Sequence, residues 1–224
     1  MDFDPQAIFR TLHEHAVESI VVGGIGGVLH GSPMSTDDVD IVPALKKANL
    51  DALAAALNEM NAKIMSRERP GGIPVRFTGK DLRRWIVDFG FLNLLTDHGR
   101  LDIIHRPGGT TGYQDLASNA ESLELGDFEI RVAALEDIIR SKQAVARDRD
   151  LAQLPTLRAL LEERRISLRV GDQVLVPWNL EERRGTIIEI RGVGPRAQTT
   201  VRVQLAEGEE EDLPLPLSLL KPTT

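Results

Sequence analysis

The chain opens with the pattern of an amphipathic helix. Asp4 can cap a helix, and Pro5 suits its first position because the proline ring already holds a helical φ. The apolar residues that follow recur at helical spacing and form one face: Ile8, Phe9, Leu12 and Ala16. A helix is therefore predicted over about 5–16.

Further helices and strands are predicted from the same kinds of spacing, up to residue 166. β-Branched or alternating apolar runs predict strands at 19–22, 38–42, 91–96 and 100–104. Apolar positions at helical spacing predict helices at 25–30, 49–57, 133–147 and 155–163, with Asn49 as the cap of the second. This mixture predicts an α+β domain.

From Ser167 onward, the pattern changes to short strands only. Runs at 173–176, 185–190, 199–205 and 211–215 are separated by Gly, Pro and charged turns. Four such strands in a short stretch favour a small curled β-barrel of the SH3-like type. We therefore expect two domains, at residues 1–166 and 167–224.

Composition narrows the class of protein. Of the 224 residues, 42% are hydrophobic and 27% are charged, as in an ordinary globular chain. No apolar run approaches the roughly 18 residues that cross a bilayer, and the acidic start MDFDPQ leads into no apolar signal core. We expect a cytoplasmic protein with no membrane contact. The absence of cysteine excludes disulfides, thiolate nucleophiles and cysteine-ligated zinc.

The formal net charge of −7 argues against a general nucleic-acid binder, which would be basic. Both predicted domains share the acidic balance. Residues 1–166 carry 20 Lys and Arg against 25 Asp and Glu, and residues 167–224 carry 7 against 9. The net charge does not exclude a small, localised basic site.

The most informative residues are two aspartates on the predicted strand 38–42. Side chains two apart share one face of a strand, so Asp38 and Asp40 project together while Val39 and Ile41 point to the core. Two carboxylates on one face repel each other unless a positive charge lies between them. Carboxylate oxygens suit a hard cation such as Mg²⁺. An exposed acidic edge is the structural alternative.

Two further features extend this pattern. Gly23-Gly24 ends a strand and opens a helix, where bare backbone N–H groups can bind phosphate, although a Gly pair is also a common turn. Asp102 interrupts an otherwise apolar strand, where a carboxylate is costly unless it meets solvent, a metal or a partner. Three carboxylates around metal ions can activate an attacking hydroxyl and stabilise a leaving pyrophosphate.

Together these residues resemble the signature of the nucleotidyltransferase superfamily with the polymerase-β-like fold. Val22-Gly23-Gly24 is similar to its hG[G/S] element, and Asp38-Val39-Asp40 to its [D/E]h[D/E] pair. Supporting stretches lie at 30–31, 96–102 and 135–139, with Thr36, Lys142, Arg147 and Asp150. Met34 departs from the pattern, because many relatives carry an arginine there.

The resemblance covers about residues 5–165 and is strongest to minimal nucleotidyltransferases and to nucleotidyltransferase toxins of toxin–antitoxin systems. It implies a mixed sheet of four or five strands flanked by helices. It also implies that Asp38, Asp40 and Asp102 are the catalytic residues and hold Mg²⁺ or Mn²⁺. Gly23 and Gly24 would then bind the triphosphate of the NTP substrate.

The helix predicted at 133–147 adds two candidate nucleotide-binding residues. Lys142 continues the apolar stripe of this helix, so it must either reach solvent or meet an anion. We interpret Lys142 as a ligand of the triphosphate, helped by Arg147. Asp150 is expected to pair with Arg147 or to cap the next helix.

The leading prediction is a Mg²⁺-dependent nucleotidyltransferase that moves NMP from an NTP to an acceptor hydroxyl. By the toxin resemblance, the acceptor would be the 3′ end of an RNA such as tRNA, or a protein side chain, and an antitoxin would be a partner. The alternative is a non-catalytic protein- or RNA-binding module built on a degenerate transferase fold. A hydrolytic phosphotransferase is disfavoured, because such enzymes usually rely on histidine and the chain has only five.

Overall fold

The computed structural model describes residues 3–178, 181–192, 197–205 and 209–223. The chain forms two compact units, Met1–Leu157 and Arg158–Thr224, which divide within one long helix, α7 (Asp148–Ile166). The sequence prediction placed the domain boundary at the end of this helix. Each unit contains its own β-sheet.

The first unit is built on an eight-stranded mixed sheet in the order β4-β3-β5-β6-β2-β1-β8-β7. β2 runs parallel to β6, and β1 runs parallel to β8. The strands are β1 (Ser19–Val22), β2 (Asp38–Pro43), β3 (Lys63–Ile64), β4 (Ile73–Pro74), β5 (Phe91–Thr96), β6 (Gly99–Ile104), β7 (Glu121–Leu125) and β8 (Phe128–Val132). The helices before α7 are α1 (Pro5–Glu14), α2 (Gly23–Leu29), α3 (Lys47–Glu59), α4 (Gly79–Phe89), α5 (Tyr113–Asn119) and α6 (Leu135–Val145). The predicted α+β class is confirmed.

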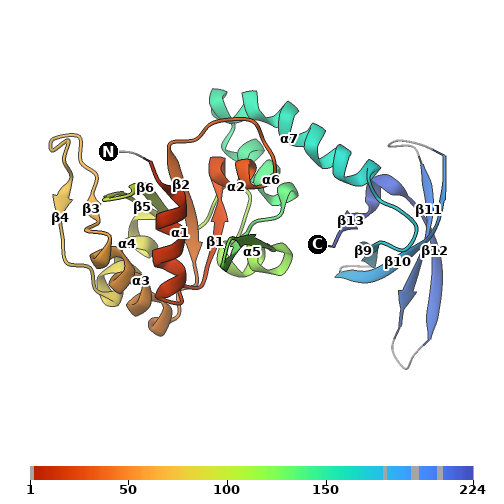
Figure 1. Cartoon of the computed structure of the whole chain (residues 1–224), viewed down its shortest axis with the longest axis horizontal. Helices are drawn as coiled ribbons and strands as arrows, with labels where there is room; N and C mark the ends of the chain where they lie inside the picture. Colours follow the sequence, from red (N-terminus) through yellow and green to blue (C-terminus); the bar gives the residue numbers. More distant parts are fainter. Residues whose placement is uncertain (1–2, 179–180, 193–196, 206–208, 224) are drawn as a thin grey trace. The chain divides into compact units, whose positions relative to one another are not determined.

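One face of this sheet forms the main hydrophobic core. α1, α3 and α4, which lie along the sheet in Figure 1, pack their apolar side chains against it. The buried strand residues of this face alternate along the central strands: Val39, Ile41, Leu92, Leu94, Leu101 and Ile103. Because side chains alternate along a strand, the residues between them lie on the opposite face.

The first helix begins as predicted and ends earlier. The Asp4 side chain accepts a hydrogen bond from the Ala7 N–H at 3.0 Å, so it is the cap that the sequence indicated. The helix stops at Glu14, however. Ala16, which we expected on its apolar face, lies beyond it, exposed and with a φ of 52°.

The prediction that Asn49 caps a helix is wrong. α3 begins two residues earlier, at Lys47, and Asn49 is buried within its first turn. The Asn49 side chain accepts from the Glu18 N–H at 2.7 Å and donates to the Glu18 and Ala44 carbonyls at 2.9 and 2.8 Å. These bonds tie α3 to the chain that enters β1.

The sheet is larger than the resemblance implied, with eight strands in place of four or five. β3 and β4 have two residues each, which is too short for an alternating pattern to be detected. β7 and β8 form an antiparallel hairpin at the other edge. These four strands extend a central group that the sequence did predict.

The second unit contains a five-stranded antiparallel sheet in the order β12-β11-β10-β9-β13. Its strands are β9 (Gln173–Trp178), β10 (Glu181–Arg191), β11 (Gln198–Gln204), β12 (Glu210–Pro216) and β13 (Lys221–Pro222), with a short helix η3 (Leu217–Leu219). The four predicted strands are present, and β13 adds a fifth. Closure of this sheet into an SH3-like barrel stays a prediction. In the described part of the chain, no helix is both long and apolar enough to span a bilayer.

Candidate functional site

The three predicted carboxylates lie on adjacent strands of the first unit. Asp38 and Asp40 alternate on β2 with the buried Val39, and Asp102 is the cross-strand partner of Asp40 on the parallel strand β6. All three carboxylates are on residues of intermediate exposure. The fold therefore brings Asp38, Asp40 and Asp102 together on the sheet face opposite the main core.

Each carboxylate has its own polar neighbours. The Thr36 hydroxyl donates to Asp38 Oδ1 at 2.8 Å, and the Asn93 amide donates to Asp102 Oδ2 at 2.5 Å. Arg100 Nη2 lies 3.9 Å from Asp38 Oδ2. The second oxygen of Asp102, Oδ1, is buried and accepts no hydrogen bond from any residue that the structure describes.

Burial and mutual repulsion raise the pKa of Asp40 to about 7. Burial is the largest cause, followed by the charges of Asp38 and Asp102, while the charge of Lys142 and a hydrogen bond from the Gly24 N–H oppose the shift. The pKa of Asp102 is raised as well, again chiefly by burial. A cation among these carboxylates would offset their repulsion.

The chemistry of the cluster fits a divalent cation, although the oxygens are not gathered into a finished metal site. Among the described residues, no three His, Asp or Glu side chains form a group placed to hold an ion. The fit rests on the buried Asp102 Oδ1, which accepts no hydrogen bond from the part of the chain that the structure describes, and on the neighbouring Asp40, whose ionised form is disfavoured by burial. Hard oxygen ligands of this kind suit Mg²⁺ or Mn²⁺.

The two glycines after β1 let the backbone pass close to the carboxylates. Gly23 has a φ of 68°, and a side chain there would overlap the carboxylate of Asp40. A Cβ on Gly24 would lie 2.8 Å from Thr36 Oγ1. The Gly24 N–H is directed at Asp40. Gly23 and Gly24 thus form a wall of the carboxylate cluster, and their contact with phosphate stays a prediction.

Lys142 is a buried positive charge next to this cluster. Its Nζ lies 3.4 Å from Asp150 Oδ1, and its charge stabilises ionised Asp40. Arg147 Nε lies 2.9 Å from the other oxygen of Asp150. The anion that Lys142 meets is therefore Asp150, and the predicted pairing of Asp150 with Arg147 is present. A role for Lys142 and Arg147 in binding triphosphate stays a prediction.

Four polar residues of the site were assigned no role at the carboxylates by the sequence-based prediction, although Thr36 and Arg100 belong to the stretches that support the resemblance. Thr36, Asn93 and Arg100 contact the carboxylates, and the charge of Arg149 on α7 lowers the pKa of Asp102. Asn93 carried a signal, because it is an amide in the middle of the apolar run 91–96. Arg149 carried none, since its proximity depends on the packing of α7.

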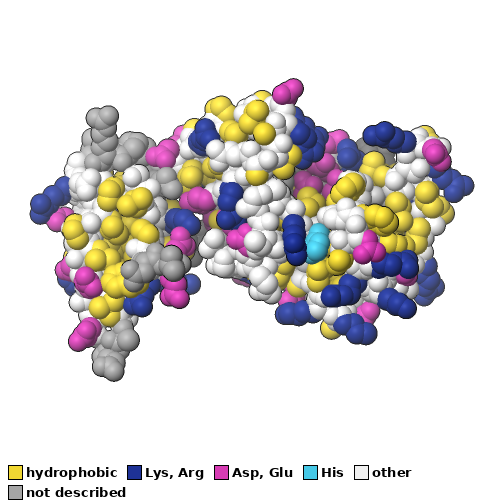
Figure 2. Space-filling model, turned by 180° about the vertical axis from the view of Figure 1, so that it is seen from behind, with side chains coloured by type: hydrophobic (Ala, Val, Ile, Leu, Met, Phe, Trp, Pro, Cys, Tyr) yellow, Lys and Arg dark blue, Asp and Glu magenta, His cyan; other side chains and the backbone are white. Residues whose placement is uncertain are grey.

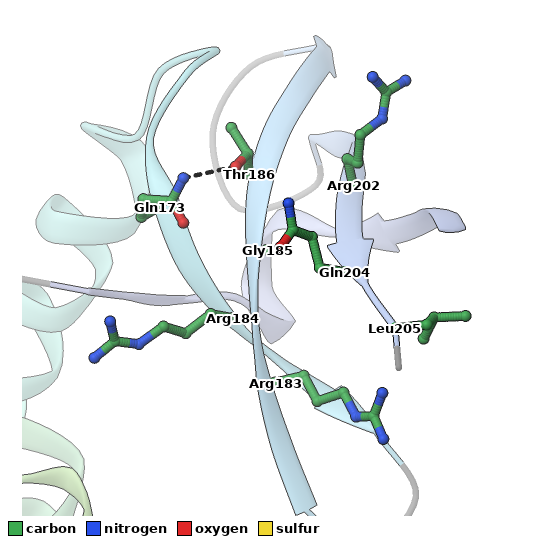
Figure 3. A pocket seen from close by; sticks show the side chains of 8 residues that line it. All are labelled: Gln173, Arg183, Arg184, Gly185, Thr186, Arg202, Gln204 and Leu205. Atoms are coloured by element: carbon green, nitrogen blue, oxygen red, sulfur yellow. Dashed lines mark hydrogen bonds between the residues drawn. The ribbon is translucent and has the colours of Figure 1, made fainter. Parts of the chain in front are cut away.

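A separate cavity of about 560 Å³ lies on β9, β10 and β11 of the second unit (Figure 3). Three arginines line it, and Figure 3 shows their side chains pointing in different directions. Arg202 is paired with Asp212 at 2.8 Å, and the guanidinium of Arg183 lies 4.9 Å from the centre of the Trp178 ring. No carboxylate is among the described residues that line this cavity, so it lacks the groups of the first site.

Comparison with known proteins concerns mainly the first unit. The sequence profile of a family described as aminoglycoside-2''-adenylyltransferase matches residues 6–157, which end where the first compact unit ends. No sequence among the curated proteins matches the chain.

Solved structures similar to this chain include an antibiotic adenylyltransferase and a protein from Thermotoga maritima. The lincosamide antibiotic adenylyltransferase LnuA, bound to lincomycin, has a TM-score of 0.48 and 16% identity, covering 71% of this chain and 99% of that chain. A protein from Thermotoga maritima, provisionally described as a nucleotidyltransferase, has a TM-score of 0.39 and 21% identity, with coverages of 71% and 91%.

Proposed function

The chain belongs to the aminoglycoside-2''-adenylyltransferase family and thereby to the nucleotidyltransferase superfamily, and on this premise we propose that it transfers AMP from ATP to a hydroxyl of a small, antibiotic-like molecule. The observation that carries the proposal is the carboxylate cluster of Asp38, Asp40 and Asp102 beside Gly23 and Gly24. The proposed metal is Mg²⁺ or Mn²⁺.

The proposed reaction assigns one role to each acid. Asp38 and Asp40 would hold the cation, which supplies positive charge to the triphosphate and to the leaving pyrophosphate. Asp102 would accept the proton of the acceptor hydroxyl, and its raised pKa makes it a stronger base than a free aspartate. The acceptor oxygen bonds to the α-phosphorus, the bond from that phosphorus to the pyrophosphate oxygen breaks, and pyrophosphate leaves.

The positive groups for the triphosphate would come from α6 and from the link between α6 and α7. Lys142 and Arg147 share Asp150 in this structure, so a bound triphosphate would compete with Asp150 for both cations. Lys142 and Gly23 line the same small cavity, which supports a common role of these two residues in binding phosphate.

RNA 3′ ends, protein side chains and an antitoxin are the acceptors and partner that the toxin resemblance implied. We rank a small-molecule acceptor ahead of them, because the family profile spans the whole first unit whereas the toxin resemblance rests on short motifs. A non-catalytic module is disfavoured, because the partial burial of three carboxylates lowers the stability of the fold and would bring such a module no benefit.

Label transfer tests the proposal. The chain, its Asp40→Asn variant and an exposed control, Asp88→Asn on α4, are incubated with Mg²⁺ and each α-³²P-labelled NTP. Hydroxyl-bearing antibiotics, total tRNA and cell extract are the acceptors. We expect ATP to label a small molecule, with a loss of at least about 100-fold in Asp40→Asn and on adding EDTA. Label on RNA or protein would overturn the acceptor, and no label from any NTP would overturn the transfer.

A further inference from the structure

The face that carries the carboxylates continues into apolar surface. On β5 and β6, Asn93 pairs with Asp102, and Phe91 pairs with Ile104. Side chains two apart share a face, so Phe91 and Ile104 lie on the same face as Asp102. Leu95 extends the row on β5. The residues that alternate with them belong to the main core: Leu92, Leu94, Leu101 and Ile103.

Met65 widens this surface. Its backbone N–H donates to the Asn93 carbonyl at 2.9 Å, so the chain after β3 continues beside β5. Ile64 packs against the main core, and alternation turns Met65 to the other face. Phe91 is 58% exposed and Met65 is 39% exposed, which is high for large apolar side chains.

We call Met65, Phe91, Leu95 and Ile104 the apolar platform. Seen from behind, the first unit shows hydrophobic side chains gathered beside a hollow that holds acidic ones (Figure 2). Exposed apolar groups that form a contiguous patch, rather than single residues, are typical of binding surfaces.

The apolar platform and the glycines lie on opposite sides of the carboxylates. Gly23 and Gly24 follow β1, which borders β2, whereas β5 and β3 lie beyond β6. The triphosphate proposed for the glycine side therefore leaves the platform side free for the acceptor. An acceptor hydroxyl must reach Asp102, whose cross-strand neighbour Asn93 lies between Phe91 and Leu95 on the same strand.

The apolar platform itself does not favour charged groups of an acceptor. Of the two cations in the neighbouring row, Lys63 lies opposite Leu95, whereas Arg100 is already paired with Asp37 at 3.2 Å and lies near Asp38. Ammonium groups of an acceptor would lose hydration against Phe91 and Met65. Apolar groups would instead gain from being removed from water there.

We propose that the acceptor carries an apolar ring or alkyl group beside its reacting hydroxyl, and that the apolar platform binds this group. The inference rests on the proposed function for the transfer itself, and it names the class of acceptor. Phe91 and Met65 are specificity-determining residues. Removing the Phe91 ring should weaken binding of such an acceptor about 10-fold and leave ATP binding unchanged.

A binding experiment tests the platform without relying on transfer. Methyl and phenyl β-D-glucoside carry the same sugar hydroxyls and differ in the apolar group. Saturation-transfer NMR titrations of the full chain should give a lower Kd for the phenyl compound, by about 10-fold. Phe91→Ser should remove this preference. Phe89→Ser is the matched control, because Phe89 is 66% exposed but belongs to α4, which packs on the other face of the sheet.

Transfer kinetics give the second measurement. For the acceptor identified by label transfer, Phe91→Ser and Met65→Gln should raise the acceptor KM and leave the ATP KM unchanged, and Phe89→Ser should change neither. A wild-type chain that prefers no glucoside, or a Phe91→Ser variant that keeps the preference, overturns the inference. So does sedimentation that shows a wild-type dimer and a monomeric Phe91→Ser, because the platform is then an interface between copies.

The two proposals fail in different ways. If transfer proceeds and Phe91→Ser changes neither Kd nor KM, the proposed transfer stands and the proposed role of the apolar platform is overturned. A phenyl preference that disappears in Phe91→Ser, without transfer to any acceptor, keeps the platform and overturns the proposed reaction.

Discussion

Substituting Asp40→Asn should make the first unit more stable above neutral pH while it abolishes transfer. In the folded chain this carboxylate is buried near Asp38 and Asp102, and its pKa is raised from an ordinary 3.8 to about 7. Above pH 7 the folded chain must hold a buried charge that the unfolded chain holds in water. An asparagine carries no such charge, and its side-chain oxygen can still accept from the Gly24 N–H.

The size and sign of this difference in the free energy of unfolding follow from the linkage between protonation and folding. A shift of about 3 pKa units corresponds to about 4 kcal/mol, at about 1.36 kcal/mol per unit. Because the folded pKa lies above the unfolded one, the free energy of unfolding falls as the pH rises from 3.8 to about 7, and is then constant. Relative to Asp40→Asn, the parent chain should therefore lose about 3 kcal/mol between pH 5 and pH 8.

Urea unfolding in EDTA at pH 5, 6, 7 and 8 measures this difference. The chain has two tryptophans, and a Trp178→Phe background leaves Trp85 of α4 as the reporter of the first unit. Trp85 packs edge-on against Phe77, with ring centres 6.1 Å apart, so unfolding changes its surroundings. Asp88→Asn is the matched control, since it removes an exposed carboxylate from the same unit.

Two results would contradict the reasoning. One is a free energy of unfolding for Asp40→Asn at pH 8 that is no higher than that of the parent. The other is a difference that stays constant from pH 5 to pH 8. As a further check, Mg²⁺ in place of EDTA should stabilise the parent at pH 8 and leave Asp40→Asn unchanged, because the cation binds only the ionised site.

Three other substitutions have defined outcomes. Gly185→Ala places a Cβ 2.6 Å from Val201 Cγ1 and should destabilise the second unit by about 1–3 kcal/mol. The fluorescence of Trp178 measures this unfolding, and an unchanged free energy of unfolding would contradict the close packing. Asn49→Ala removes the side-chain partner of the Glu18 N–H and of the Ala44 carbonyl, while the Glu18 carbonyl keeps its bond from the Ala44 N–H, and should cost about 1–3 kcal/mol in urea unfolding of the first unit. Lys142→Met should raise the KM for ATP about 10-fold, and an unchanged KM would show that Lys142 serves only to neutralise Asp150.

The positions of Asp38 and Asp40 were predictable because alternation on a strand is a local property. Val39 and Ile41 had to face the core, so both acids had to face away from it. Asp102 could be recognised as an acid in an apolar strand. Its pairing with Asp40 could not be read from spacing, because parallel pairing of β2 with β6 depends on the whole topology of the sheet.

The surroundings of Lys142 were predictable only in part. The apolar stripe on its helix indicated that Lys142 either reaches solvent or meets an anion, and the structure shows it buried beside Asp150. That Asp150 is this anion follows from the turn at Ala146, where a φ of 53° ends α6 and redirects the chain into α7. A non-glycine residue in the left-handed region has no clear signature in the sequence.

The close approach of Gly23 to Asp40 makes the order of mutations matter. A methyl group at Gly23 overlaps the Asp40 carboxylate, so the two positions cannot vary independently, and their effects on stability should be strongly non-additive in a double-mutant cycle. Truncating Asp40 to alanine would remove the two closest overlaps, although Asp40 Cβ would still lie 2.9 Å from a Cβ at Gly23 and the φ of 68° would still disfavour a side chain there. Once that side chain was in place, restoring Asp40 alone would create a clash, so loss of the acid would be difficult to reverse by single substitutions.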